Sequence, residues 1–184
     1  MQGPRDYFFY TVDSNILAQL ACALHAAFLI RRLKTGRNVP GRVTVFKYAA
    51  SCCLALTFTV VVLVLAPCYG AAGYKAMLLS GSMLFHHLLC PAAALLSFIL
   101  FDAGPRLPRS AVRIALLPTV IYAVVLVSLN AAGLVEGPYP FLRVRAQPWW
   151  ASILWVCAIL GGAYLLALLV RALNGRKAGS PAKI

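Results

Sequence analysis

Two adjacent histidines, His86 and His87, lie deep inside an uncharged run of residues, Ala76–Phe101. If this run crosses a bilayer as a helix, about ten residues at 1.5 Å each place both imidazoles roughly 15 Å deep, near the midplane. An ionisable side chain at that depth is a functional-site candidate by default. The alternative is a neutral histidine that hydrogen-bonds across helices and holds a bundle together.

Pro91 follows His87 by four positions. Because proline has no N–H to donate to the carbonyl four residues before it, we expect a kink and a free carbonyl acceptor at His87. Tyr122 is expected near the depth of His87 and could hydrogen-bond to it. His25 is expected near a membrane surface, as a packing or snorkelling residue.

A second polar group opens the first apolar segment and comprises Thr11, Asp13, Ser14 and Asn15. Thr11 and Asn15 are four residues apart and therefore share a helix face. A threonine hydroxyl becomes a nucleophile when a base lies within hydrogen-bonding reach. The same residue types are also the preferred caps of helix N-termini, so ordinary capping is the competing interpretation.

The elements that must position these groups are apolar helices. Five stretches hold no charged residue, and a bilayer core about 30 Å thick needs roughly 20 apolar residues per helix. The stretches are Ser14–Ile30, Tyr48–Tyr74, Ala76–Phe101, Ile114–Val135 and Ala146–Val170. The chain is 62% hydrophobic and only 11% charged, which excludes a soluble domain. We predict an all-α, polytopic transmembrane bundle in one domain (1–173), with spanning helices at about 11–30, 46–67, 76–101, 113–135 and 149–171.

The net charge of +13 is distributed unevenly between the predicted loops. One side of the membrane receives 13 of the 17 basic residues, in the connections after segments one and three and in the tail. The other side receives Arg5, Lys75, Arg143 and Arg145. By the positive-inside rule the N-terminus lies outside, the C-terminus is cytoplasmic, and the basic tail 174–184 is expected to be disordered. Membrane lipids are the expected partners, and no nucleic acid is expected because the basic loops carry no interleaved aromatics.

The positions of the six cysteines indicate neither disulfide bonds nor a metal site. Five lie inside apolar runs, and Cys68 alone lies near an outer loop, so we expect small buried hydrophobic side chains. No Cys-x-x-Cys or His/Cys ligand spacing is present, so the sequence predicts no metal site and no cofactor. The first residues lack the pattern of a cleavable signal, and we expect the first segment to direct insertion.

Several short motifs occur in a fixed order along nearly the whole chain. They are Tyr10-Thr11-Val12-Asp13-Ser14-Asn15-Ile16-Leu17, Phe85-His86-His87-Leu88-Leu89-Cys90-Pro91, Phe98-Ile99-Leu100-Phe101-Asp102, Pro118-Thr119-Val120-Ile121-Tyr122 and Glu136-Gly137-Pro138-Tyr139-Pro140-Phe141-Leu142. In this order they resemble the androgen-induced / androgen-dependent TFPI-regulating protein family, and its uncharacterised bacterial relatives in particular. The animal members are multi-pass membrane hydrolases of fatty acid esters of hydroxy fatty acids, with an essential threonine and an essential histidine.

The resemblance implies that Thr11 is the nucleophile and that His87, or alternatively His86, is the general base. Asn15 or Ser14 would donate to the oxyanion, with Asp13 and Tyr122 as supporting residues. The family usually has a helix ahead of the threonine motif, whereas ten residues precede Thr11 here, which suggests a shortened form or a misplaced start. Counting residues along the expected helices puts Thr11 and His87 about 9 Å apart in depth, too far for a direct hydrogen bond.

Two hypotheses follow for the function. The first is a threonine-type hydrolase of fatty acyl esters in a membrane, of bacterial type by the resemblance, with substrate entering from the outer leaflet. The second is a non-catalytic bundle that binds lipid or a partner membrane protein and uses the histidines as structural hydrogen-bonding groups. The sequence leaves both open, and leaves the oligomeric state open as well.

Overall fold

The computed structural model describes residues 4–102 and 107–175. In this part the chain has five helices that are long and apolar enough to cross a membrane, which confirms the polytopic all-α bundle. The main helices are α1 (Tyr10–Thr35), α2 (Gly41–Val60), α5 (Cys90–Phe101), α6 (Ser110–Ala131) and α7 (Trp149–Gly175). Two short helices, α3 (Gly70–Leu78) and α4 (Gly81–Leu84), complete the fold between α2 and α5.

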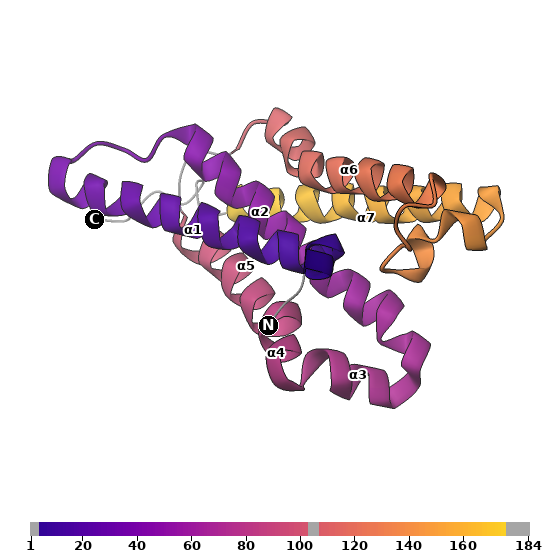
Figure 1. Cartoon of the computed structure of the whole chain (residues 1–184). Coiled ribbons are helices and arrows are strands. Elements are labelled where there is room, and N and C mark those ends of the chain that lie inside the picture. Colours follow the sequence, from indigo (N-terminus) through magenta and orange to yellow (C-terminus); the bar gives the residue numbers. More distant parts are fainter. Residues whose placement is uncertain (1–3, 103–106, 176–184) are drawn as a thin grey trace.

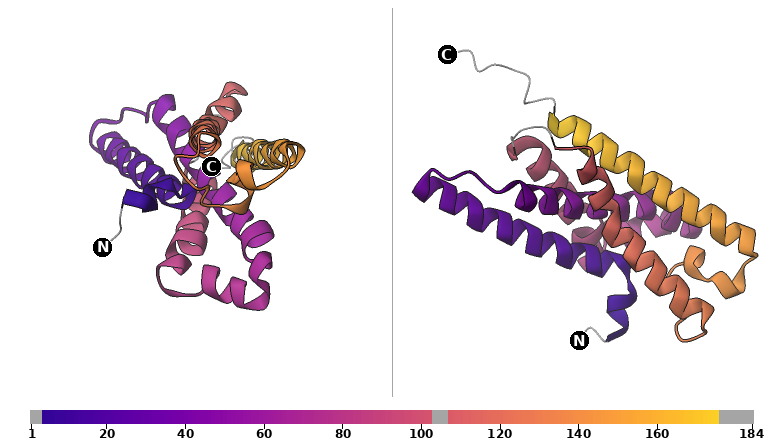
Figure 2. Two further views of the ribbon diagram at one scale, coloured as in Figure 1. Left: turned by 45° about the vertical axis from the view of Figure 1, so that its right-hand side comes forward. Right: turned by 90° about the horizontal axis from the view of Figure 1, so that it is seen from above.

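Helix α2 is the centre of the bundle and packs against α1, α5, α6 and α7 (Figures 1 and 2). In its apolar span 61% of the residues are buried, against 17–22% in the other four spans. Small side chains supply much of this contact, including Ala49, Ala50, Cys52 and Cys53. Lipid tails are as apolar as leucine, so close approach at small residues is what holds such helices together.

Helix α1 continues to Thr35, five residues beyond the predicted end at 30. Arg31, Arg32 and Lys34 occupy its last turns and favour it, because cations stabilise the negative end of the helix dipole. Gly36 ends the helix with a φ of 70°, and its N–H bonds to the Arg32 carbonyl. Helix α7 includes Asn174 and Gly175, which the sequence assigned to the tail; residues 176–184 lie outside the described part.

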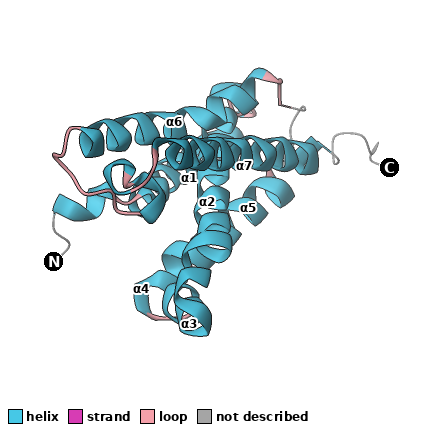
Figure 3. Cartoon of the chain, turned by 90° about the vertical axis from the view of Figure 1, so that its right-hand side faces the viewer, coloured by secondary structure: helices cyan, strands magenta, loops and turns pink. Residues whose placement is uncertain are grey.

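The third predicted span, 76–101, is not one helix. The chain leaves α2 through a π-helical turn at Val61–Leu65 and turns back into α3, which ends before a bend at Leu79 and Ser80. Gly73 allows this turn, since a Cβ there would overlap the Ala66 carbonyl oxygen. Helix α4 then begins the span that continues into α5, and the α3–α4 hairpin projects from the rest of the bundle (Figure 3).

At the opposite end, buried charges join α1, α2 and α5. The Lys47 ammonium lies 2.6 Å from the Asp102 carboxylate and donates to Ser97 at 2.8 Å, while His25 Nε2 lies 3.5 Å from Asp102. Asn174 of α7 donates to the Phe98 and Asp102 carbonyls at 3.1 Å each. The sequence analysis expected His25 to be a packing or snorkelling residue and gave it no charged partner. We call this end, which also holds Arg32, Arg42, Arg109 and Arg171, the basic end.

Breaking the buried pair should destabilise the fold strongly. Asp102→Ala leaves the Lys47 ammonium buried without a counter-ion, and we expect a loss of about 3–5 kcal/mol in the free energy of unfolding. The double variant Lys47→Met/Asp102→Leu should recover most of that loss, because neither charge remains. Denaturation of the purified protein in detergent measures both.

The matched control is Glu136→Ala, which removes the exposed partner of Arg143. An exposed ion pair contributes about 0–1 kcal/mol, so this variant should be close to wild type. Equal losses in Asp102→Ala and Glu136→Ala would show that the pair does not hold the helix ends together.

Candidate active site

The side chains of Thr11 and His87 meet directly. Thr11 Oγ1 lies 3.2 Å from His87 Nε2, and both residues are buried. The expected depth difference of about 9 Å was wrong because His87 is six residues into a helical span that begins at Gly81, not eleven into one that begins at Ala76. Thr11 is the second residue of α1, so both groups lie near the same end of the bundle.

The second ring nitrogen of His87 determines its tautomer. His87 Nδ1 lies 2.8 Å from the backbone carbonyl of Met77, the residue before the last of α3. A carbonyl can only accept, so Nδ1 carries the proton and a neutral ring leaves Nε2 as an acceptor. The Thr11 hydroxyl therefore donates to Nε2, which is the arrangement of a nucleophile and its base.

A π-helical turn at Phe85–Leu89 presents the two histidines. The Cys90 N–H bonds to the Phe85 carbonyl, five residues back. In this pattern the donor for the His86 carbonyl would be Pro91, which has no N–H. The carbonyl that gains an outside partner is thus that of His86, and not that of His87 as expected: Asn15 Nδ2 donates to it at 3.2 Å.

The other polar residues of the first motif hold Thr11 in place. Asn15 Nδ2 also donates to the Thr11 carbonyl at 2.8 Å, and the Ser14 hydroxyl donates to the same carbonyl at 3.1 Å. Ser14 lies 2.9 Å from the Thr57 hydroxyl of α2. Asp13 is half-buried and takes no part in these hydrogen bonds. The Asn15 and Ser14 donors are thus directed at main-chain carbonyls.

Tyr139 is a site residue that the sequence did not identify. Its hydroxyl accepts a hydrogen bond from the Thr11 N–H at 3.5 Å, and its ring stacks on Phe141 with centroids 5.1 Å apart. Burial raises the pKa of Tyr139, so the hydroxyl keeps its proton at neutral pH. The Glu136–Leu142 motif could have indicated this position, but nothing in it shows which way the ring turns.

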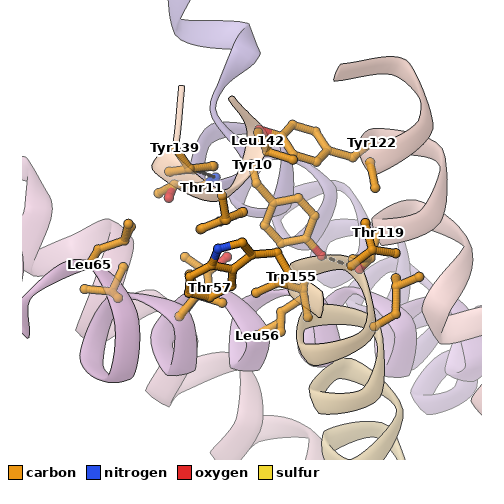
Figure 4. A pocket seen from close by; sticks show the side chains of 17 residues that line it. Tyr10, Thr11, Leu56, Thr57, Leu65, Thr119, Tyr122, Tyr139, Leu142 and Trp155 are labelled. Atoms are coloured by element: carbon orange, nitrogen blue, oxygen red, sulfur yellow. Dashed lines mark hydrogen bonds between the residues drawn. The ribbon is translucent and has the colours of Figure 1, made fainter. Parts of the chain in front are cut away.

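An apolar pocket of about 60 Å³ adjoins Thr11 and Tyr139 (Figure 4). Helices α2, α6 and α7 contribute most of its walls, with Val60, Ala123 and Trp155 among them. Tyr10 bonds to Thr119 at 2.7 Å across this pocket. Tyr122 also lines it, but its hydroxyl donates to the Phe8 carbonyl at 2.7 Å, so the expected bond to His87 is absent.

His86 differs from its neighbour. It is only partly buried, and it belongs to the site through its main-chain carbonyl. Of the two histidines left open by the sequence, His87 is therefore the one that meets Thr11. Within residues 4–102 and 107–175, no group of three His, Cys, Asp or Glu residues is placed to hold a metal ion.

Asn15 should stabilise this site through its two main-chain bonds. Asn15→Ala removes the donors to the Thr11 and His86 carbonyls, and an unpaired buried acceptor costs about 1–3 kcal/mol. We expect a loss of that size in detergent denaturation. Gln19→Ala, one turn further along α1 and exposed, is the control and should be near neutral. A near-neutral Asn15→Ala would show that the His86 carbonyl needs no partner.

Searches of protein-family models, curated proteins and solved structures found no match to this chain.

Proposed function

We propose that the protein is a threonine-type hydrolase of fatty acyl esters in a membrane. The observation that carries this proposal is the chain of contacts from Thr11 Oγ1 to His87 Nε2 at 3.2 Å and from His87 Nδ1 to the Met77 carbonyl at 2.8 Å. It places a hydroxyl, a base and an orienting acceptor in the order that nucleophilic catalysis uses. The resemblance in sequence points to the same threonine and to the same pair of histidines.

The chemistry would proceed in two halves. Thr11 Oγ1 attacks the ester carbonyl carbon while His87 Nε2 takes the hydroxyl proton. The tetrahedral intermediate collapses, the C–O bond to the alcohol breaks, and His87 returns the proton to the leaving oxygen. Water, activated by the same Nε2, then attacks the acyl-threonine and releases the fatty acid and free Thr11.

The developing oxyanion would be stabilised by Tyr139 and by the start of α1. The Tyr139 hydroxyl accepts from the Thr11 N–H, so its own proton is available to donate. The Val12 and Asp13 N–H groups at the start of α1 bond to the Phe9 carbonyl, so this helix end contributes the positive end of its dipole and the Thr11 N–H that is directed at Tyr139. We assign the oxyanion to this position in place of Asn15 and Ser14, whose donors are directed at carbonyls.

The pocket favours a hydrocarbon substituent. Its walls combine aliphatic side chains with Phe141 and Trp155, but a volume of about 60 Å³ holds only a short piece of a hydrocarbon chain. We propose that the part of the acyl chain next to the ester lies in it, with the ester carbonyl at Thr11.

A purely structural role is the second candidate. Both ring nitrogens of His87 are hydrogen-bonded, and Thr11 is only 9% exposed. A buried, fully satisfied histidine between helices is also what interhelical packing produces. In that case the bundle would bind lipid or a partner without turning it over.

The catalytic proposal predicts separate effects on activity and stability. With a p-nitrophenyl ester of a medium-chain fatty acid and purified protein in detergent, Thr11→Val and His87→Gln should lose about 10²–10⁴-fold in turnover. Thr11→Ser should retain activity because it keeps the hydroxyl, and His86→Gln should retain it because the His86 side chain does not meet Thr11. Thermal melting checks that each variant is folded.

The structural candidate predicts the opposite pattern. Wild type would then show no turnover above the detergent blank, and Thr11→Val and His87→Gln would melt at lower temperature. Equal turnover in wild type and Thr11→Val would remove Thr11 from any mechanism.

We also propose that the basic end faces the cytoplasm and the Thr11 end faces outward, from the asymmetry of basic residues. Cysteines introduced at Gly36 and Glu136, in a background without native cysteines, measure this. An impermeant maleimide added to intact cells should label position 136, which is exposed, and label position 36 only after lysis. Labelling of position 36 in intact cells would show that the protein has the orientation opposite to the one proposed.

A further inference from the structure

A cavity of about 980 Å³ opens at the basic end and shares no lining residue with the pocket beside Thr11. Helix α2 forms its floor with Val45, Phe46 and Ala49, and α1 and α6 form two of its walls. Both of these helices pack against α2. The cavity is therefore a groove between two helices that are held apart by a third.

The groove has an unbalanced positive charge. Arg32 and Arg42 line it, and neither forms an ion pair with a residue that the structure describes. The chain has four acidic side chains, and the only one at this end is Asp102, which is already paired with Lys47 at 2.6 Å. No side-chain carboxylate remains for the two guanidinium groups, so an anion from outside the chain is favoured there.

The rest of the groove is apolar and runs along the helix axes. On α1 it extends from Arg32 through Leu29 to Leu17, about 22 Å at 1.5 Å per residue. On α6 its wall includes Leu117 and Ile121, which are 53% and 61% exposed. One leaflet of a bilayer has a hydrocarbon depth of about 15 Å, so the groove has the length of one leaflet plus its head-group layer.

We propose that one phospholipid with an anionic head group occupies this groove. Its phosphate lies between Arg32 and Arg42, where guanidinium groups can bind phosphate oxygens in pairs. One acyl chain lies along α1 and α6 over Phe46, and comes from the leaflet next to the basic end. Basic pockets between transmembrane helices recognise anionic head groups in this way, and the interaction adds to the hydrophobic contact.

The test counts lipids bound to the full-length protein. The delipidated protein in neutral detergent is titrated with dioleoyl-phosphatidylglycerol or dioleoyl-phosphatidylcholine, and native mass spectrometry reports the bound lipids. We expect one phosphatidylglycerol to bind more tightly than phosphatidylcholine. Arg32→Gln/Arg42→Gln should weaken phosphatidylglycerol binding about 25-fold, at roughly fivefold per arginine near a head group.

The matched control is Arg31→Gln/Arg37→Gln, which removes the same charge from the same end but from residues that do not line the groove. It should leave the affinity unchanged. Leu117→Trp places a larger side chain in the apolar part of the groove and keeps both arginines. This variant should weaken the binding of both lipids.

Three results would overturn the proposal. They are equal affinity for the two lipids, equal weakening by the two arginine pairs, and displacement of phosphatidylglycerol by inorganic phosphate. The last would identify a site for a soluble anion. None of these measurements depends on Thr11, so the lipid site and the proposed hydrolysis can fail independently.

Discussion

Hydrocarbon offers no hydrogen-bonding partner to a polar group, so each such group in the spanning helices must find its partner inside the protein. In the π-helical turn the His86 carbonyl is the group that lacks a partner, because Pro91 has no N–H to donate to it. Asn15 from α1 supplies the missing donor. The same contact brings the start of α1 against the histidine turn, so that Thr11 and His87 meet.

Two clusters of polar side chains lie at opposite ends of the bundle. At one end, neutral hydroxyl, amide and imidazole groups satisfy one another around Thr11, next to an apolar pocket. At the other end, Lys47, Asp102 and His25 form a charged cluster beside a larger groove. Helix α2 contributes to both clusters through Thr57 and Lys47, so the central helix links them.

The sequence predicted five spanning segments, because long apolar runs are visible residue by residue. It paired Thr11 with His87 only through the family resemblance, and counting residues along the expected helices placed them too far apart for the contact that the structure shows. It did not predict the break at Leu79 and Ser80, since no charged residue marks it, and the wrong helix start produced the wrong depth for His87. Tyr139 and the Lys47–Asp102 pair depend on which helices become neighbours. That information is not contained in the periodicity of any one segment.

The orienting partner of His87 is a main-chain oxygen, that of Met77. Any amino acid at position 77 carries the same carbonyl, so no point substitution there deletes the acceptor. Alanine scanning would not detect the role of position 77, and the residue type there can vary between related sequences without loss of the acceptor. In an enzyme that orients its histidine with an aspartate, one codon change can disable the base. Here the equivalent change requires an insertion, a deletion or a substitution to proline that shifts the backbone of α3. The orientation of His87 is therefore insensitive to most side-chain changes at position 77 and sensitive to changes in the length of one short hairpin.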